Sequence, residues 1–134
     1  MAAYVELNRV SDRYPGAART LKEIDLTIPA GESTAVFGAS GSGKSTLAYL
    51  FNGLIPHFFG GLLEGTVVVA GNPTRNTMVS ELFSHVGLVL QNTDAQLFNA
   101  TVEDDVAFGL ESHGYPAIDI RKRTHRISDA LGIT

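Results

Sequence analysis

The chain has 134 residues, 44% of them hydrophobic, with a formal net charge of -4 at pH 7 and no cysteine. This length is enough for one domain with a hydrophobic core and too short to indicate two. The lack of cysteine excludes disulfides and thiolate metal sites, and the mild acidity gives no chain-wide signature of nucleic-acid binding. No stretch has the apolar length of a membrane-spanning helix, and the N-terminus lacks the pattern of a secretion signal. We therefore expect a soluble, cytosolic chain that reaches a membrane only through a partner.

Two half-buried strands are predicted near the N-terminus. Residues 4–10 alternate apolar and polar side chains, and residues 21–29 nearly do so. Tyr14, Pro15 and Gly16 mark the turn between them. A second turn at residues 29–32 leads into residues 33–37, a short and mostly apolar run that predicts a buried strand.

The pattern G-x-x-x-x-G-K-[ST] follows, with Gly38, Gly43, Lys44 and Ser45 at its defining positions. Its glycines let backbone N–H groups turn toward phosphate oxygens, Lys44 adds charge at the β- and γ-phosphates, and Ser45 can ligate Mg²⁺. A helix predicted over residues 45–52 would point its N-terminus at the phosphates. A flexible glycine-rich turn is the alternative. We expect a nucleoside triphosphate site formed by Gly38, Ala39, Ser40, Gly41, Ser42, Gly43, Lys44, Ser45 and Thr46.

A loop, two strands and a short helix are predicted in the middle of the chain. Residues 54–61 predict a loop, and residues 65–71 predict a strand bounded by glycines. A short amphipathic helix is expected over residues 77–83. The apolar run 86–90, which ends at Gln91, predicts a second buried strand.

Two helices are predicted in the last third. Thr101 can cap the first, which places Glu103, Asp104 and Asp105 in its first turn, where carboxylates favour the positive dipole end. Helix-start stabilisation is favoured over metal binding for these acids. The last helix covers about residues 116–131, with proline at its start and glycine after its end. Its basic run, residues 121–123, is interpreted as a solvated face.

The chain resembles the N-terminal half of an ABC transporter nucleotide-binding domain, most closely the energy-coupling-factor and cobalt-type import ATPases. The most discriminating stretches are residues 91–98 (QNTDAQLF) and 101–109 (TVEDDVAFG). Residues 52–59 (NGLIPHFF) also resemble members in which two ATPase domains are fused. The matching segments further include residues 14–16, 26–32, 38–46, 52–61 and 87–92.

This resemblance implies an α/β P-loop NTPase fold of the ABC ATPase type, in three parts. The first is an N-terminal antiparallel β-subdomain, with strands at about residues 3–33 and 62–72. The second is an incomplete RecA-like core at about residues 34–61 and 84–92. The third is the start of the helical subdomain at about residues 93–134.

The resemblance also implies roles for residues outside the phosphate loop. Tyr14 would stack on the adenine ring, the alternative being a turn tyrosine packed on its own strand. Gln91 would contact Mg²⁺ or the attacking water and act with Lys44 in catalysis, whereas a lone glutamine after a strand is otherwise a solvated cap. Ser45 and Gln91 would thus be the metal ligands. Leu97 and Phe98, with Gln96, would face a membrane coupling protein, or else belong to the core.

Hydrolysis requires a carboxylate that holds Mg²⁺ and a group that positions water. No apolar run in the chain ends in the Asp-Glu pair of Walker B, and the LSGGQ signature and the later switch histidine are absent. The chain resembles a cut domain, so we expect it to be marginally stable and to associate through an unpaired strand edge at residues 33–37.

The sequence therefore predicts the ATP-binding N-terminal part of an energy-coupling-factor ABC transporter. Such a protein couples ATP hydrolysis, with Mg²⁺, to import of a vitamin or metal ion. Its partners would be a transmembrane coupling protein and a second ABC ATPase domain, at the cytoplasmic face of the cell membrane. The alternatives are a nucleotide-binding fragment without ATPase activity and a non-transport ABC protein.

Overall fold

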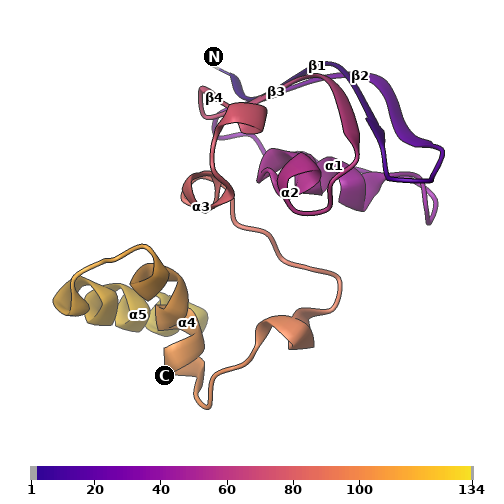
Figure 1. Ribbon diagram of the computed structural model, residues 1–134. Helices are drawn as coiled ribbons and strands as arrows, with labels where there is room; N and C mark the ends of the chain where they lie inside the picture. Colours follow the sequence, from indigo (N-terminus) through magenta and orange to yellow (C-terminus); the bar gives the residue numbers. More distant parts are fainter. Residues whose placement is uncertain (1–2, 134) are drawn as a thin grey trace. The chain divides into compact units, whose positions relative to one another are not determined.

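The computed structural model describes residues 3–133, which divide into two compact units on either side of the step from Leu88 to Val89. The first unit is built on an antiparallel sheet with the strand order β2-β1-β3-β4 (Figure 1). Its strands are β1 (Ala3–Arg13), β2 (Arg19–Pro29), β3 (Leu62–Val69) and β4 (Asn72–Pro73). The three strands predicted from alternation and bounding glycines are thus confirmed. Strands β1 and β2 are longer than the predicted runs, and β3 begins before residue 65 and ends before residue 71.

Strand β1 lies between β2 and β3 and pairs with both. Leu7 lies opposite Leu26 on β2 and opposite Val67 on β3. Directly opposed residues in an antiparallel pair share a face, so this row sets an apolar surface on one side of the sheet. The register shifts between Leu7 and Val10 on the β2 side and between Asn8 and Ser11 on the β3 side, which marks bulged pairing in the middle of β1.

Two helices cover one face of this sheet, α1 (Lys44–Phe51) and α2 (Leu54–His57) (Figure 1). Leu50 of α1 and Ile55 of α2 are fully buried against the sheet. Residues 54–61, predicted as a loop, therefore contain one short helix. The core consists of Val5, Leu7, Val10, Leu21, Leu50, Ile55, Leu63, Val67 and Val69.

Two predicted buried strands are wrong. Residues 33–37 and 86–90 form no strand, and within residues 3–133 neither run pairs with one. Phe37 is 92% exposed and Val89 is 78% exposed, whereas Val86 is partly buried against the core. The physical reason is that a strand is stabilised by backbone hydrogen bonds to a neighbour, which an apolar run cannot supply for itself.

The segment after β4 contains η1 (Thr74–Asn76) and α3 (Val79–Leu82). The amphipathic helix predicted over residues 77–83 is confirmed in type but is shorter, because extended backbone at Met78 precedes its first turn. Leu82 is its buried residue.

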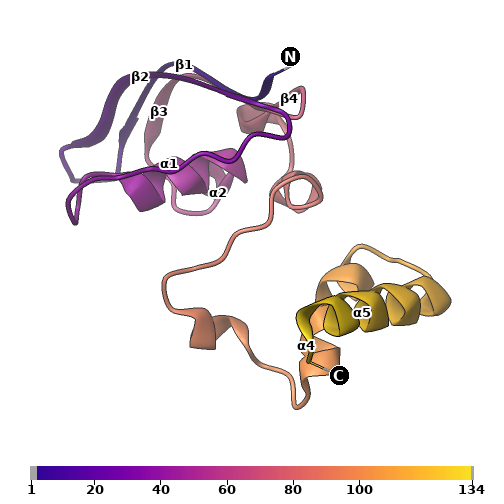
Figure 2. The ribbon, with the colours of Figure 1, turned by 180° about the vertical axis from the view of Figure 1, so that it is seen from behind.

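The second unit contains η2 (Thr93–Gln96) and a pair of helices, α4 (Val102–Ser112) and α5 (Ala117–Leu131) (Figure 2). The Thr101 hydroxyl accepts a hydrogen bond from the Asp104 backbone N–H at 3.1 Å, which confirms the predicted cap. Helix α5 starts after Pro116 and ends at Leu131, before Gly132, as predicted. No helix within the described part of the chain combines the length and apolarity needed to cross a membrane.

Candidate functional site

The phosphate loop enters α1 through Gly43, which caps the helix in a left-handed conformation with φ of 100°. A side chain at this position would be strained, and its Cβ would lie 2.9 Å from Cδ2 of Leu21 on β2. No side chain caps the helix start. The first backbone N–H groups of α1 have no carbonyl partner within the helix, so they are available to an anion.

Lys44 closes the loop on itself. Its Nζ donates hydrogen bonds to the carbonyl oxygens of Gly38 at 2.8 Å and Ala39 at 2.7 Å, and to Oγ of Ser42 at 3.3 Å. The Lys44 ammonium group is thus held inside the loop, where its positive charge lies beside the start of α1. Residues 38–42 are exposed, and the Ser45 hydroxyl is exposed beside them.

Tyr14 lies next to this cradle. Its hydroxyl is 3.3 Å from Oγ1 of Thr46, a buried residue in the first turn of α1. The ring is half-buried and packs on the edge of the hydrophobic core. The structure therefore brings Tyr14 together with the phosphate loop, and its ring also makes the packing contacts that the alternative interpretation describes. Adenine stacking stays a prediction.

Gln91 belongs to the second unit and is exposed. Its action with Lys44 and Ser45 stays a prediction. Nearby, Gln96 accepts a hydrogen bond from the Leu90 backbone N–H through Oε1 at 2.9 Å.

Leu97 and Phe98 are exposed and therefore are not core residues of the second unit. Phe98 contacts Phe108 of α4 edge to face, with ring centroids 4.8 Å apart. Asp105 orders this turn, because its Oδ1 accepts hydrogen bonds from the backbone N–H and side-chain amide of Asn99 at 3.1 and 2.9 Å. The acids at the start of α4 thus serve the helix start and its preceding turn.

An apolar hollow of about 230 Å³ adjoins the cradle. It is lined by residues of β2, of α1 and of the run 33–37 that precedes the phosphate loop. The lining residues are Leu21, Ile24, Val36, Phe37, Gly38, Ser42, Gly43, Lys44 and Leu47.

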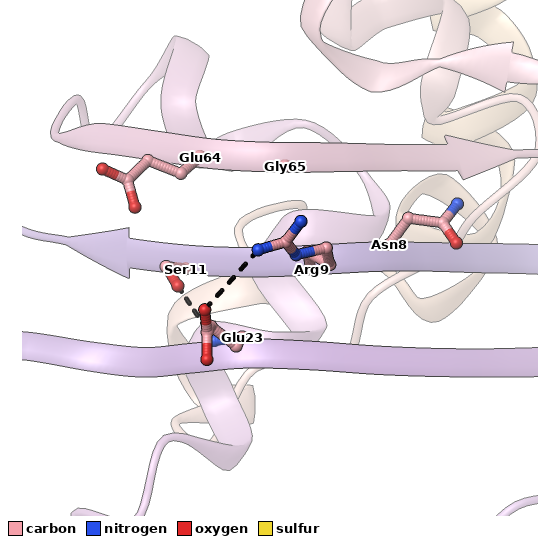
Figure 3. A pocket seen from close by; sticks show the side chains of 6 residues that line it. All are labelled: Asn8, Arg9, Ser11, Glu23, Glu64 and Gly65. Atoms are coloured by element: carbon pink, nitrogen blue, oxygen red, sulfur yellow. Dashed lines mark hydrogen bonds and ion pairs between the residues drawn. The ribbon is translucent and has the colours of Figure 1, made fainter.

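A second hollow, of about 370 Å³, lies on the sheet where β1, β2 and β3 run side by side (Figure 3). Arg9 and Glu23 form an ion pair across it at 3.9 Å, and both side chains are mostly exposed. Ser11 Oγ accepts a hydrogen bond from the Glu23 backbone N–H at 2.9 Å. These groups satisfy one another at the bulge, and none belongs to the phosphate loop.

The sequence patterns missed Asp12, which is 1% exposed on the central strand. It lies opposite Leu21 and Leu63, two core residues. Burial raises the pKa of the Asp12 carboxyl, an effect that the Arg13 backbone N–H partly offsets. Neither carboxylate oxygen has a hydrogen-bond partner of normal geometry among the described residues. Strict alternation continued from Val5 and Leu7 would place Asp12 on the polar face, so no local pattern signals its burial. The register shifts in the middle of β1 turn it toward the core.

Metal ligands are sparse. In the part of the chain that the structure describes, no group of three or more His, Asp or Glu side chains could hold a metal ion. A bound Mg²⁺ would therefore depend on oxygen ligands such as the Ser45 hydroxyl together with the phosphates themselves.

Residues 21–134 match the protein family described as ABC transporter. An ABC transporter ATP-binding protein of Pyrococcus abyssi is 45% identical over 120 residues, and one of Pyrococcus horikoshii is 47% identical. Each alignment covers 89% of this chain but only 43% and 42% of the relatives, so the chain spans less than half of their length.

The fold has a similar solved counterpart, CbiO1 from Clostridium perfringens, which is part of the ABC transporter complex cbiONQ. The TM-score is 0.82 at 31% sequence identity, over 99% of this chain and 52% of that chain. This likeness confirms the predicted fold class, part of an ABC-type P-loop ATPase with an antiparallel β-subdomain and helices.

Proposed function

This chain belongs to the ABC transporter family, and we propose that it supplies the ATP cradle of an energy-coupling-factor import ATPase. The single observation that carries the proposal is the loop between Gly38 and Lys44, closed around the lysine ammonium at the uncapped start of α1. The loop offers backbone N–H donors and one positive charge, which together suit the β- and γ-phosphates of a nucleotide.

The donor set fits ATP with Mg²⁺. Ser45 exposes a hydroxyl one residue into α1, and Gln91 would supply an amide oxygen from the second unit. Tyr14, beside Thr46, would carry the adenine ring on its face. When bound, Mg²⁺ would neutralise charge on the phosphates, and every other contact in this proposal comes from the residues named above.

The import type rests on the sequence resemblance and on the likeness to CbiO1, which is itself part of a transporter complex. A transmembrane coupling protein and a second ABC ATPase domain would be the partners, at the cytoplasmic membrane face. Exposed Leu97 and Phe98 support this, because a loop that presents two large apolar side chains has surface to bury against another protein. The assignment of residues 93–134 to the start of a helical subdomain belongs to the same proposal.

Hydrolysis would require groups beyond those of the cradle. The 134 residues include no Asp-Glu pair after an apolar run and no LSGGQ signature. We expect this chain to bind Mg·ATP without turning it over, and Lys44 and Gln91 to act in catalysis only together with those groups.

The test is ATP affinity, measured by calorimetry in Mg²⁺, for the wild-type chain, Lys44→Ala and Lys22→Ala. Lys22 is an exposed lysine on β2 and is the matched control for loss of one positive charge. We expect Lys44→Ala to lower the affinity at least about tenfold, since a charge-assisted contact is removed, and Lys22→Ala to leave it unchanged. Equal affinities for wild type and Lys44→Ala would contradict the proposal.

A further inference from the structure

The phenolic hydroxyl of Tyr14 joins two parts of the chain that are 32 residues apart. It lies 3.3 Å from the Thr46 hydroxyl, within hydrogen-bond distance. Thr46 is 6% exposed in the first turn of α1, so its hydroxyl has little access to water. A hydrogen bond in such a place is better protected from solvent competition than one on the surface.

The backbone at Tyr14 is held independently of this contact. Gly61, with φ of 95°, lies so close that an added Cβ would be 3.5 Å from Cα of Tyr14 and would collide with the Arg13 carbonyl oxygen. On the other side, the Ala17 backbone N–H donates to the Tyr14 carbonyl oxygen at 3.1 Å and closes the turn. With the backbone fixed, the position of the ring depends on its half-buried packing and on the hydroxyl contact.

We infer that the Tyr14 hydroxyl is a positioning group, which fixes the aromatic ring relative to the phosphate loop through Thr46. The inference rests on the proposed function, because a fixed ring matters only if the ligand carries a planar base as well as phosphates. Without the hydroxyl, the ring would have to be ordered when the nucleoside binds. Ordering a mobile side chain costs free energy, and this cost weakens binding of the base but not binding of the phosphates.

The inference predicts different effects on the affinities of two ligands that the phosphate loop would bind. ATP would contact both the ring and the loop, whereas inorganic tripolyphosphate would contact the loop alone. The ratio of their dissociation constants therefore depends on the contact between the ring and the base. Direct contacts of Thr46 with phosphate affect both ligands equally and do not change the ratio.

The test is this ratio, Kd for ATP over Kd for tripolyphosphate, in Mg²⁺ for the full chain and four variants. Tyr14→Phe keeps the ring but removes its hydroxyl. Thr46→Val replaces the partner hydroxyl with a methyl group of similar volume, and Thr46→Ser keeps that hydroxyl. The fourth variant combines Tyr14→Phe with Thr46→Val. We expect Tyr14→Phe and Thr46→Val each to raise the ratio about three- to tenfold. The double variant should raise it no further, and Thr46→Ser should match wild type.

The outcomes distinguish this inference from the proposed function. A wild-type chain that binds neither ligand would overturn the proposed function and the positioning role with it. A wild-type chain that binds both, with an unchanged ratio in Tyr14→Phe, would overturn the positioning role alone. Additive effects in the double variant would also overturn it, because residues that act through one contact are not independent.

Discussion

The central strand β1 and the run 33–37 both contain apolar residues, but only β1 forms a strand. Strand β1 pairs on both sides and contributes Val5, Leu7 and Val10 to the core. Residues 33–37 pair with no strand among residues 3–133 and expose Phe37 almost completely. An apolar run therefore indicates that a segment suits a strand, while a lateral partner decides whether it becomes one.

The largest expected effect is on the stability of the core beneath the paired strands. Leu50→Ala removes a fully buried side chain packed under the sheet and should lower the free energy of unfolding by about 2–5 kcal/mol. Leu62→Ala, at a side chain that is more than half exposed, should change it by less than about 0.5 kcal/mol. Urea unfolding followed by circular dichroism measures both. Equal losses would show that the core is not where β1, β3 and α1 meet.

The buried carboxyl group of Asp12 on β1 lowers the stability of the first unit near neutral pH. Its pKa is raised in the folded state, so its stabilising contribution is complete below its ordinary pKa and is lost as the pH rises through the raised value. Asp12→Asn should therefore unfold at a higher temperature than wild type at pH 7, and the advantage should shrink on acidification. A melting-temperature series from pH 3 to 7 tests this sign. A variant less stable at pH 7 would contradict it.

In the second unit, stability depends on local hydrogen bonds. Thr101→Ala removes the hydroxyl that accepts from the Asp104 N–H and should destabilise the start of α4 by about 1 kcal/mol. Faster amide exchange at Asp104 is the measurement. Thr93→Ala, in η2, is the control, and an equal acceleration at Asp104 in the two variants would refute the cap.

The smallest expected change concerns self-association. Residues 33–37 expose apolar side chains that a second copy of the chain could bury, so Phe37→Ser should weaken concentration-dependent association. Phe58→Ser, at an exposed phenylalanine elsewhere in the first unit, should leave the association unchanged. Sedimentation velocity over a range of concentrations distinguishes the two. A wild-type chain that is monomeric throughout and melts cooperatively at a concentration-independent temperature would contradict the expectation.

Local patterns predicted the elements whose causes are local. Alternation identified β1 and β2, a capping threonine gave the start of α4, and an initial proline and a final glycine gave both limits of α5. The glycine-lysine pattern predicts the phosphate loop, because its spacing reflects backbone geometry within nine residues, and nucleotide binding there stays a prediction.

The remaining features depend on neighbours distant in sequence. Residues 86–90 carry no sign that they lack a partner strand. The contact between Tyr14 and Thr46 joins two elements that no local pattern relates. The burial of Asp12 likewise depends on where Leu21 and Leu63 lie across the sheet.

We propose that the paired strands of the first unit hold a phosphate loop ready for ATP while the run 33–37 stays open. Hydrogen–deuterium exchange of the wild-type chain, with and without Mg·ATP, tests it most directly. We predict slow exchange in β1 and β3 under both conditions, fast exchange at residues 33–37, and slower exchange at residues 38–46 only when Mg·ATP is present. Unchanged exchange at residues 38–46 on adding saturating Mg·ATP would contradict the account.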